Sequence, residues 1–167
     1  MRIAVVVGNP KAGSRTLGVA TAVADALAKG VGAPPDHLVV DLAEHASELF
    51  DWNSPRLSSL TAEVASAGLI VAASPTYKAA YTGMLKAFLD RYGSNGLAGS
   101  VAVPVMTGGW AGHMLAVEVH LRPVLVELGA TVPARGLYVT EPELPELGAA
   151  VTKWSATAVP LIKSALP

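Results

Sequence analysis

The stretch Ile3-Ala-Val-Val-Val-Gly-Asn-Pro-Lys-Ala-Gly-Ser-Arg-Thr16 joins a short apolar run to a polar loop, and a helical pattern follows it. Two later segments repeat this order. The run 69–73 leads into Ser-Pro-Thr-Tyr-Lys at 74–78, and the run 101–106 leads into Thr-Gly-Gly-Trp at 107–110. Each run is typical of a strand that is buried on both faces of a parallel sheet. Because the carboxyl ends of parallel strands share one edge, the three loops are predicted to outline one ligand site.

Strands and helices are predicted to alternate along the chain. Further strands are expected at 37–41 and 132–139. Helical spacing of apolar residues predicts helices at 17–27, 57–67, 84–92, 114–128 and 151–166, and 140–147 is predicted to be a surface loop. Pro123 must kink or restart the fourth helix, because proline has no amide donor. This alternation favours right-handed parallel crossovers. It predicts an α/β fold: a flavodoxin-like three-layer sandwich with a five-stranded parallel sheet of order 2-1-3-4-5.

Bulk composition bounds the possible functions. A length of 167 residues predicts one domain, 1–167, with a substantial core. The chain has no cysteine, which excludes disulfides, thiolate metal sites and cysteine nucleophiles. Twelve Lys and Arg against thirteen Asp and Glu provide no basic stripe, so no nucleic-acid partner is expected. A composition that is 51% hydrophobic and 15% charged favours a homo-oligomer.

The beginning of the sequence and its histidines suggest no membrane or metal partner. The first apolar run is too short for a signal peptide or a membrane helix, so a cytoplasmic protein without a membrane partner is expected. His37, His45 and His120 share no metal-ligand spacing, and no metal site is expected.

The loop after the first strand has the chemistry of a phosphate site. Gly8 and Gly13 allow sharp turns, and Ser14 stands where a helix N-cap belongs. The hydroxyls of Ser14 and Thr16, the Arg15 guanidinium and free helix amides could bind a phosphate dianion, with added charge from Lys11. The lysine of a Walker A loop and the dinucleotide motif Gly-x-Gly-x-x-Gly are both missing, so a monophosphate such as that of FMN fits better. The alternative is that Ser14 only caps a helix and Arg15 is solvated.

The other two loops could receive a planar ring. Pro75 stiffens a loop that can lay its backbone and the Tyr77 ring against a heterocycle, although Tyr77 could equally be a packing residue. The glycines of Thr107-Gly108-Gly109 let backbone amides approach a ligand closely. Trp110 could cap the ring or line a subunit contact. His113 could serve as a proton donor, but a single histidine on an amphipathic helix is usually structural, so no catalytic residue is assigned.

Taken together, these segments resemble the NADPH-dependent FMN reductase family, and especially the reductases of two-component alkanesulfonate monooxygenase systems. The likeness spans residues 2–138. It rests on Gly8-Asn9-Pro10 through Ser14-Arg15-Thr16, on Ser74-Pro-Thr-Tyr-Lys-Ala-Ala-Tyr-Thr-Gly-Met-Leu-Lys-Ala-Phe-Leu-Asp90, and on Thr107-Gly-Gly-Trp-Ala-Gly-His113 with the helix that follows. The chain departs from the family pattern at Trp110 and at Val119.

The resemblance implies FMN, a nicotinamide reductant (NADPH or NADH), a homodimer or homotetramer, and a monooxygenase that uses the reduced flavin. It assigns the phosphate to Asn9, Ser14, Arg15 and Thr16. It implies that the flavin is flanked by Pro75, Thr76, Tyr77 and Lys78, and that its pyrimidine side is bound by Thr107, Gly108 and Gly109.

Four functions stay open at this point. The leading hypothesis is an NAD(P)H-dependent FMN reductase. The alternatives are a reductase of quinones, azo dyes or metal oxyanions with fixed FMN, a flavodoxin-like electron carrier, and a nucleotide-binding regulatory domain. The weak net charge argues against the carrier.

Overall fold

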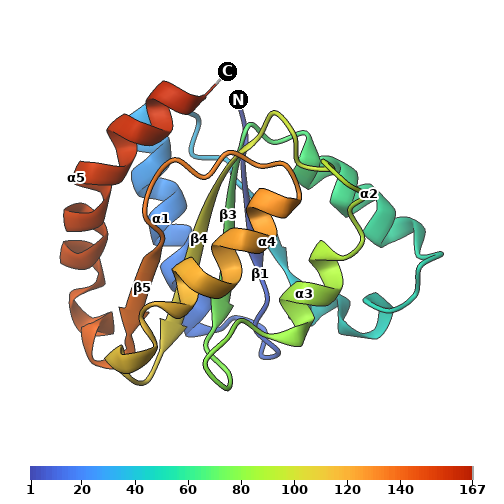
Figure 1. Ribbon diagram of the computed structural model, residues 1–167, viewed down its shortest axis with the longest axis horizontal. Coiled ribbons are helices and arrows are strands. Elements are labelled where there is room, and N and C mark those ends of the chain that lie inside the picture. The colour runs from blue at the N-terminus through green and yellow to red at the C-terminus, as the bar shows by residue number, and fades with distance from the viewer. Residues whose placement is uncertain (167) are drawn as a thin grey trace.

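The computed structural model describes residues 1–166 and shows a parallel sheet of five strands between two layers of helices (Figure 1). The strand order is β2-β1-β3-β4-β5, which confirms the predicted fold class and topology. The strands are β1 Ile3–Val7, β2 Leu38–Asp41, β3 Leu69–Pro75, β4 Val101–Gly108 and β5 Leu137–Thr140. That residues 1–167 form a single domain stays a prediction, and Pro167 lies outside the described residues.

Helices cover both faces of this sheet. On one face lie α1 Arg15–Val31 and α5 Leu147–Ala165. The other face carries α2 Pro55–Ala65, α3 Gly83–Leu89 and α4 Arg122–Glu127. The shorter helical segments are η1 Leu42–Glu48, η2 Ala111–His113, the π-helix η3 Val117–Leu121, and η4 Glu141–Glu146. No helix within residues 1–166 is long and apolar enough to cross a membrane.

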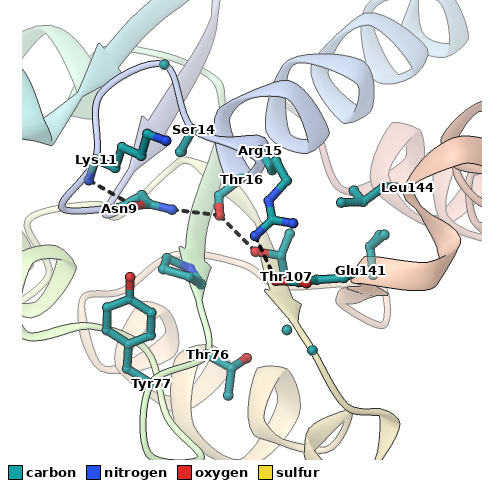
Figure 2. Close-up of a pocket in the computed structure, with 15 residues that line it drawn as sticks. Asn9, Lys11, Ser14, Arg15, Thr16, Thr76, Tyr77, Thr107, Glu141 and Leu144 are labelled. Atoms are coloured by element: carbon teal, nitrogen blue, oxygen red, sulfur yellow. Dashed lines mark hydrogen bonds and ion pairs between the residues drawn. The ribbon is translucent and has the colours of Figure 1, made fainter.

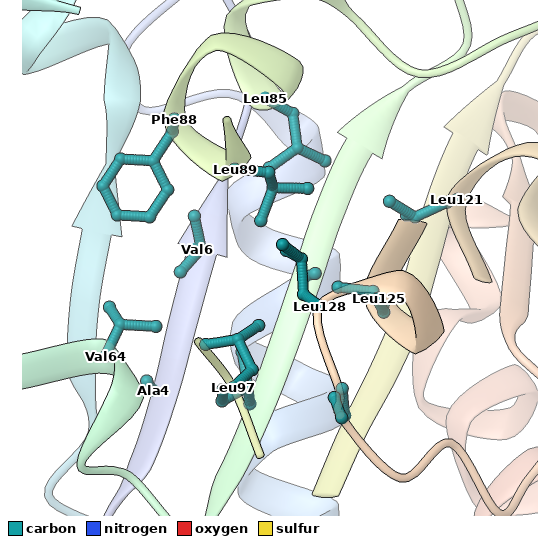
Figure 3. Packing of buried hydrophobic residues seen from close by; sticks show 14 of the residues in the cluster. Ala4, Val6, Val64, Leu85, Phe88, Leu89, Leu97, Leu121, Leu125 and Leu128 are labelled. Atoms are coloured by element: carbon teal, nitrogen blue, oxygen red, sulfur yellow. The ribbon is translucent and has the colours of Figure 1, made fainter. Parts of the chain in front are cut away.

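Successive residues of the central strands enter two separate hydrophobic cores, because side chains alternate across a sheet. Val5 and Val7 of β1 pack with α1 and α5, whereas Ala4 and Val6 pack with α3 and α4. Figure 3 shows Leu85, Phe88 and Leu89 of α3 gathered around Val6. The double burial explains why these strands are continuous apolar runs in the sequence.

The predicted fifth strand, 132–139, is wrong over its first half. Ala102 of β4 donates its amide to the carbonyl of Thr131, but Pro104, on the same edge of β4, has no amide to donate. The ladder therefore lapses and resumes only where Val105 pairs with Leu137. Other groups satisfy the backbone in between. The Arg122 guanidinium donates to the carbonyls of Val132 and Ala134 at 2.7 and 2.9 Å, and the Gly136 amide donates to Glu118 at 2.6 Å.

Two other segments also refine the predictions. The predicted surface loop 140–147 is largely the short helix η4, and α5 begins directly after it at Leu147. Pro123 lies where the helix changes type: the π-helix η3 ends at Leu121, and α4 follows without a break at Arg122. The kink or restart predicted at Pro123 is therefore seen as a change from π- to α-helix, not as a gap in the helical backbone.

Candidate functional site

The predicted loops meet at the carboxyl edge of the sheet and enclose a pocket of about 400 Å³. The pocket lies where β1, β3 and β4 end, as expected for ligand sites of doubly wound sheets. Figure 2 shows how residues from three loops and from η4 face it. Its lining comprises Asn9, Lys11, Gly13, Ser14, Arg15, Thr16, Pro75, Thr76, Tyr77, Thr107, Gly108, Gly109, Val139, Glu141 and Leu144.

The first loop is held in shape by two side chains that accept backbone hydrogen bonds. Asn9 accepts from the amide of Lys11 at 2.9 Å, which tightens the turn after β1. Gly13 adopts the left-handed conformation, with a φ of 61°, and its amide donates to the carboxylate of Asp41 at 3.0 Å. Asp41 is buried at the end of β2, so the neighbouring strand fixes the point at which the loop turns into α1.

The N-terminus of α1 opens into the pocket. Ser14 caps the helix, since its side chain accepts from the amide of Leu17 at 3.2 Å, and this confirms the predicted cap. The amides of Arg15 and Thr16, at the first two positions of α1, have no intrahelical partner and lie at the positive end of the helix dipole. With the Arg15 guanidinium and the Lys11 ammonium beside them, these donors match the chemistry of a phosphate group.

A chain of hydrogen bonds ties the first loop to the third. The Asn9 side-chain amide donates to the Thr16 hydroxyl at 3.2 Å, and this hydroxyl is 2.8 Å from that of Thr107. Both threonines are buried. The hydroxyl of Thr16 thus joins the two loops to each other.

The second and third loops form the opposite part of the pocket. The Thr76 amide donates to the carbonyl of Thr107 at 2.7 Å, which links the two loops. The Thr76 hydroxyl is buried without a hydrogen-bond partner within the described chain. A Cβ on Gly108 would collide with the Tyr138 hydroxyl, whereas a Cβ on Gly109 would meet open space. A buried hydroxyl without a partner, next to backbone that carries no side chain, suits a flat ligand with polar atoms at its edges. The isoalloxazine ring of FMN is such a ligand.

Lys78 and Trp110 are the two predicted site residues that do not line the pocket. Lys78 and Ala79 have φ values of 52° and 65° and form the tip of a tight turn that pairs Tyr77 with Ala80. Trp110 is 66% exposed, and its ring packs edge-on against His113. Contact of either residue with a ligand stays a prediction.

Several residues at the site were not predicted from the sequence. Val139 lines the pocket because β5 ends at the same edge of the sheet as β1, β3 and β4. Glu141 and Leu144 line it from η4, which follows β5 in the chain. Glu141 is the first acidic residue after the fifth apolar run, and this position could have suggested it. Asp41 and its bond to Gly13 depend on strand pairing, which the loop sequence alone does not reveal. Residues 1–166 contain no cluster of three His, Asp or Glu side chains that could hold a metal ion.

Comparison with known proteins agrees with this architecture. The family model described as NADPH-dependent FMN reductase matches residues 1–142. An FMN reductase (NADPH) of Escherichia coli is 38% identical over 93 residues, which are 56% of this chain and 49% of that protein. A Pseudomonas putida protein named NADH-dependent FMN reductase SfnF is 32% identical over 84% of this chain and 77% of its own length.

A solved structure extends the likeness to three dimensions. The apo form of an NADH:FMN oxidoreductase superposes with a TM-score of 0.79 at 25% identity, over 94% of this chain and 89% of that one. The matched part of the chain spans only about half the length of the E. coli relative.

Proposed function

The chain belongs to the NADPH-dependent FMN reductase family, and from this membership we propose that it transfers a hydride from NADPH or NADH to FMN. A hydride, which is one proton with two electrons, leaves the nicotinamide, and a second proton from water completes the reduced flavin. One observation carries the proposal. A pocket at the carboxyl edge of β1, β3 and β4 has anion donors at one end and bare glycine backbone with an orphaned hydroxyl at the other.

Under this proposal, the two ends of the pocket bind different parts of the flavin. Ser14, Arg15 and the first-turn amides of α1 hold the phosphate. Asn9 and Thr16 hold the first loop in position for it. Pro75, Thr76 and Tyr77 flank the ring on one side, and Thr107, Gly108 and Gly109 flank it on the other.

The protein's part in the reaction is binding and orientation. Bound FMN supplies the hydride acceptor. The chain holds the phosphate so that the ring lies against the second and third loops, and the linked loops keep this arrangement rigid. Holding two reactants in a productive geometry accounts for several kcal/mol of barrier reduction, about 7–11 kcal/mol in favourable cases.

We also propose that the reduced flavin is consumed by a flavin-dependent monooxygenase and that the protein acts as a cytoplasmic homo-oligomer. The monooxygenase is supported by the sequence resemblance described above. A homo-oligomer is supported by exposed apolar side chains on the segment 110–126, namely Trp110, Met114, Leu115, Val119 and Val126. The absence of cysteine fits a protein that needs no oxidising compartment.

Steady-state kinetics test the activity. We expect NADPH or NADH oxidation to saturate with added FMN if the flavin is a substrate. If FMN is a fixed prosthetic group, the purified protein would be yellow and its rate would depend on a second acceptor. Oxidation no faster than without protein, for either nucleotide and with FMN present, would contradict the proposal. Bound flavin that stays oxidised after anaerobic addition of NADPH and NADH would instead favour a role without chemistry.

A further inference from the structure

Glu141 places a negative charge in the part of the pocket that is rich in anion donors. It is the first residue of η4, directly after β5, and its carboxylate lines the pocket. Oε1 of Glu141 is 2.8 Å from Nη2 of Arg15, and Figure 2 shows the two side chains meeting beside Thr107. The cation best suited to a ligand phosphate therefore already has an anionic partner.

The position of Glu141 is fixed by the helix that carries it. At the start of η4, the backbone amide and the hydroxyl of Thr140 both donate to the carboxylate of Glu143, at 2.8 and 2.6 Å. Leu144, one turn further on, also lines the pocket. Glu141 is thus held at the mouth of the site by a capped helical turn.

A bound phosphate and the Glu141 carboxylate would compete for the same hydrogen-bond donor. Both are acceptors for the Arg15 guanidinium, which has a limited set of donors in one plane. They also repel each other as like charges. Lys11 and the α1 amides favour the phosphate, so Glu141 would reduce phosphate affinity without abolishing it.

We propose that Glu141 competes with the ligand phosphate for Arg15 and thereby makes FMN an exchangeable substrate of this pocket, with faster release than the donors alone would allow. This inference rests on the proposed function, because it assumes that the pocket receives FMN. The Arg15 and Glu141 side chains are 67% and 51% exposed, so the pair itself is weak, as surface ion pairs are. A weak competitor suits an exchangeable ligand, since it lowers affinity by a moderate factor.

The test compares FMN with riboflavin, which has the same ring but no phosphate. Flavin-fluorescence titration and stopped-flow release would be measured for wild type, Glu141→Gln and Glu141→Ala. We expect both variants to bind FMN about three- to tenfold more tightly, mainly through slower release, and to bind riboflavin as wild type does. The gain should shrink at high salt, because ions screen exposed charges. Glu146→Gln, on the same helix but outside the pocket lining, is the matched control and should change neither flavin.

Measuring the effect of Glu141→Gln in an Arg15→Ala variant tests whether Arg15 is the group for which Glu141 and the phosphate compete. There we expect Glu141→Gln to give a smaller gain in FMN affinity than it gives in the wild-type background. An equal gain in the two backgrounds would overturn the competition for Arg15. Unchanged or weaker FMN binding by Glu141→Gln, or an equal gain for riboflavin, would also overturn the inference. A wild-type protein that binds neither flavin would overturn the proposed function itself, which separates the two failures.

Discussion

At the scale of single residues, Gly8 sets how closely the first loop approaches α3. Its amide donates to the carbonyl of Ala73 in β3, and its carbonyl accepts from the Thr82 hydroxyl at the start of α3. A Cβ at this position would overlap the Cβ and the backbone of Leu85. Since backbone cannot move aside as a side-chain end can, only glycine allows the loop, β3 and α3 to meet here.

We therefore expect Gly8→Ala to lower the free energy of unfolding by about 2–3 kcal/mol, the cost of overpacking. Gly18→Ala is the matched control. Gly18 lies in α1 with open space where its Cβ would be, so alanine there should raise stability by about 0.5–1 kcal/mol. Urea unfolding of the two variants checks both signs. Equal effects of the two substitutions would contradict the close approach.

The residues of the site show which parts of it could be predicted from the sequence. The Ser14 cap and the loop glycines follow from local chemistry, and the structure brings eleven of the thirteen predicted binding residues to the pocket lining. Glu141 could not be placed in this way, because its contact with Arg15 joins positions 126 residues apart. Such a contact depends on where β5 ends relative to β1.

At the scale of elements, the segment between β4 and β5 depends on Arg122. Pro104 prevents a continuous hydrogen-bond ladder between β4 and the segment before β5. The Arg122 guanidinium takes the place of the missing ladder bonds by donating to the carbonyls of Val132 and Ala134. The sequence pattern of 132–139 looks like a strand because its apolar residues are buried. Burial and ladder pairing are separate properties, and only the first is visible in hydrophobic patterning.

Arg122→Ala should therefore destabilise the protein by about 1.5–3 kcal/mol, because it removes charged hydrogen bonds from partly buried carbonyls. Arg56, exposed on α2, provides the control, and Arg56→Ala should stay within about 0.5 kcal/mol of wild type. Chemical denaturation measures both. Equal stability of the two variants would show that the 132–136 backbone does not need the guanidinium.

The start of η4 should respond to acid. Hydrogen bonds from the Thr140 side chain and backbone lower the pKa of Glu143 below its ordinary value. A lowered pKa in the folded state stabilises the protein above the ordinary pKa, and this contribution is lost as the pH falls through the folded value. The free energy of unfolding of Glu143→Gln should thus differ from that of wild type more at about pH 6 than at about pH 3. A difference that does not change with pH would contradict the capping role.

At the scale of the whole molecule, the two faces of the sheet differ in what their outer helices expose. Apolar side chains on the segment 110–126 are exposed on the α4 side, and Leu161 of α5 is exposed on the opposite layer. If the former surface joins two copies of the chain, Val119→Asp should lower the mass measured by analytical ultracentrifugation. Leu161→Asp should leave that mass unchanged. A monomeric wild type, or equal masses for both variants, would contradict an interface on the α4 side.

The architecture was predictable because the apolar runs, the helical spacing and the crossover rule each restrict the topology independently. They specify which strand ends share an edge, and hence that the three loops meet. The detailed volume of the pocket was not predictable, since it also depends on η4.

The central claim is that this edge of the sheet holds FMN with its phosphate at the N-terminus of α1. A crystal structure of the protein with saturating FMN tests it most directly. We expect the phosphate beside Ser14 and Arg15, and the ring between Thr76 and the Thr107–Gly109 segment. Flavin density at another place on the molecule, or a pocket that stays empty while FMN is saturating, would contradict the account.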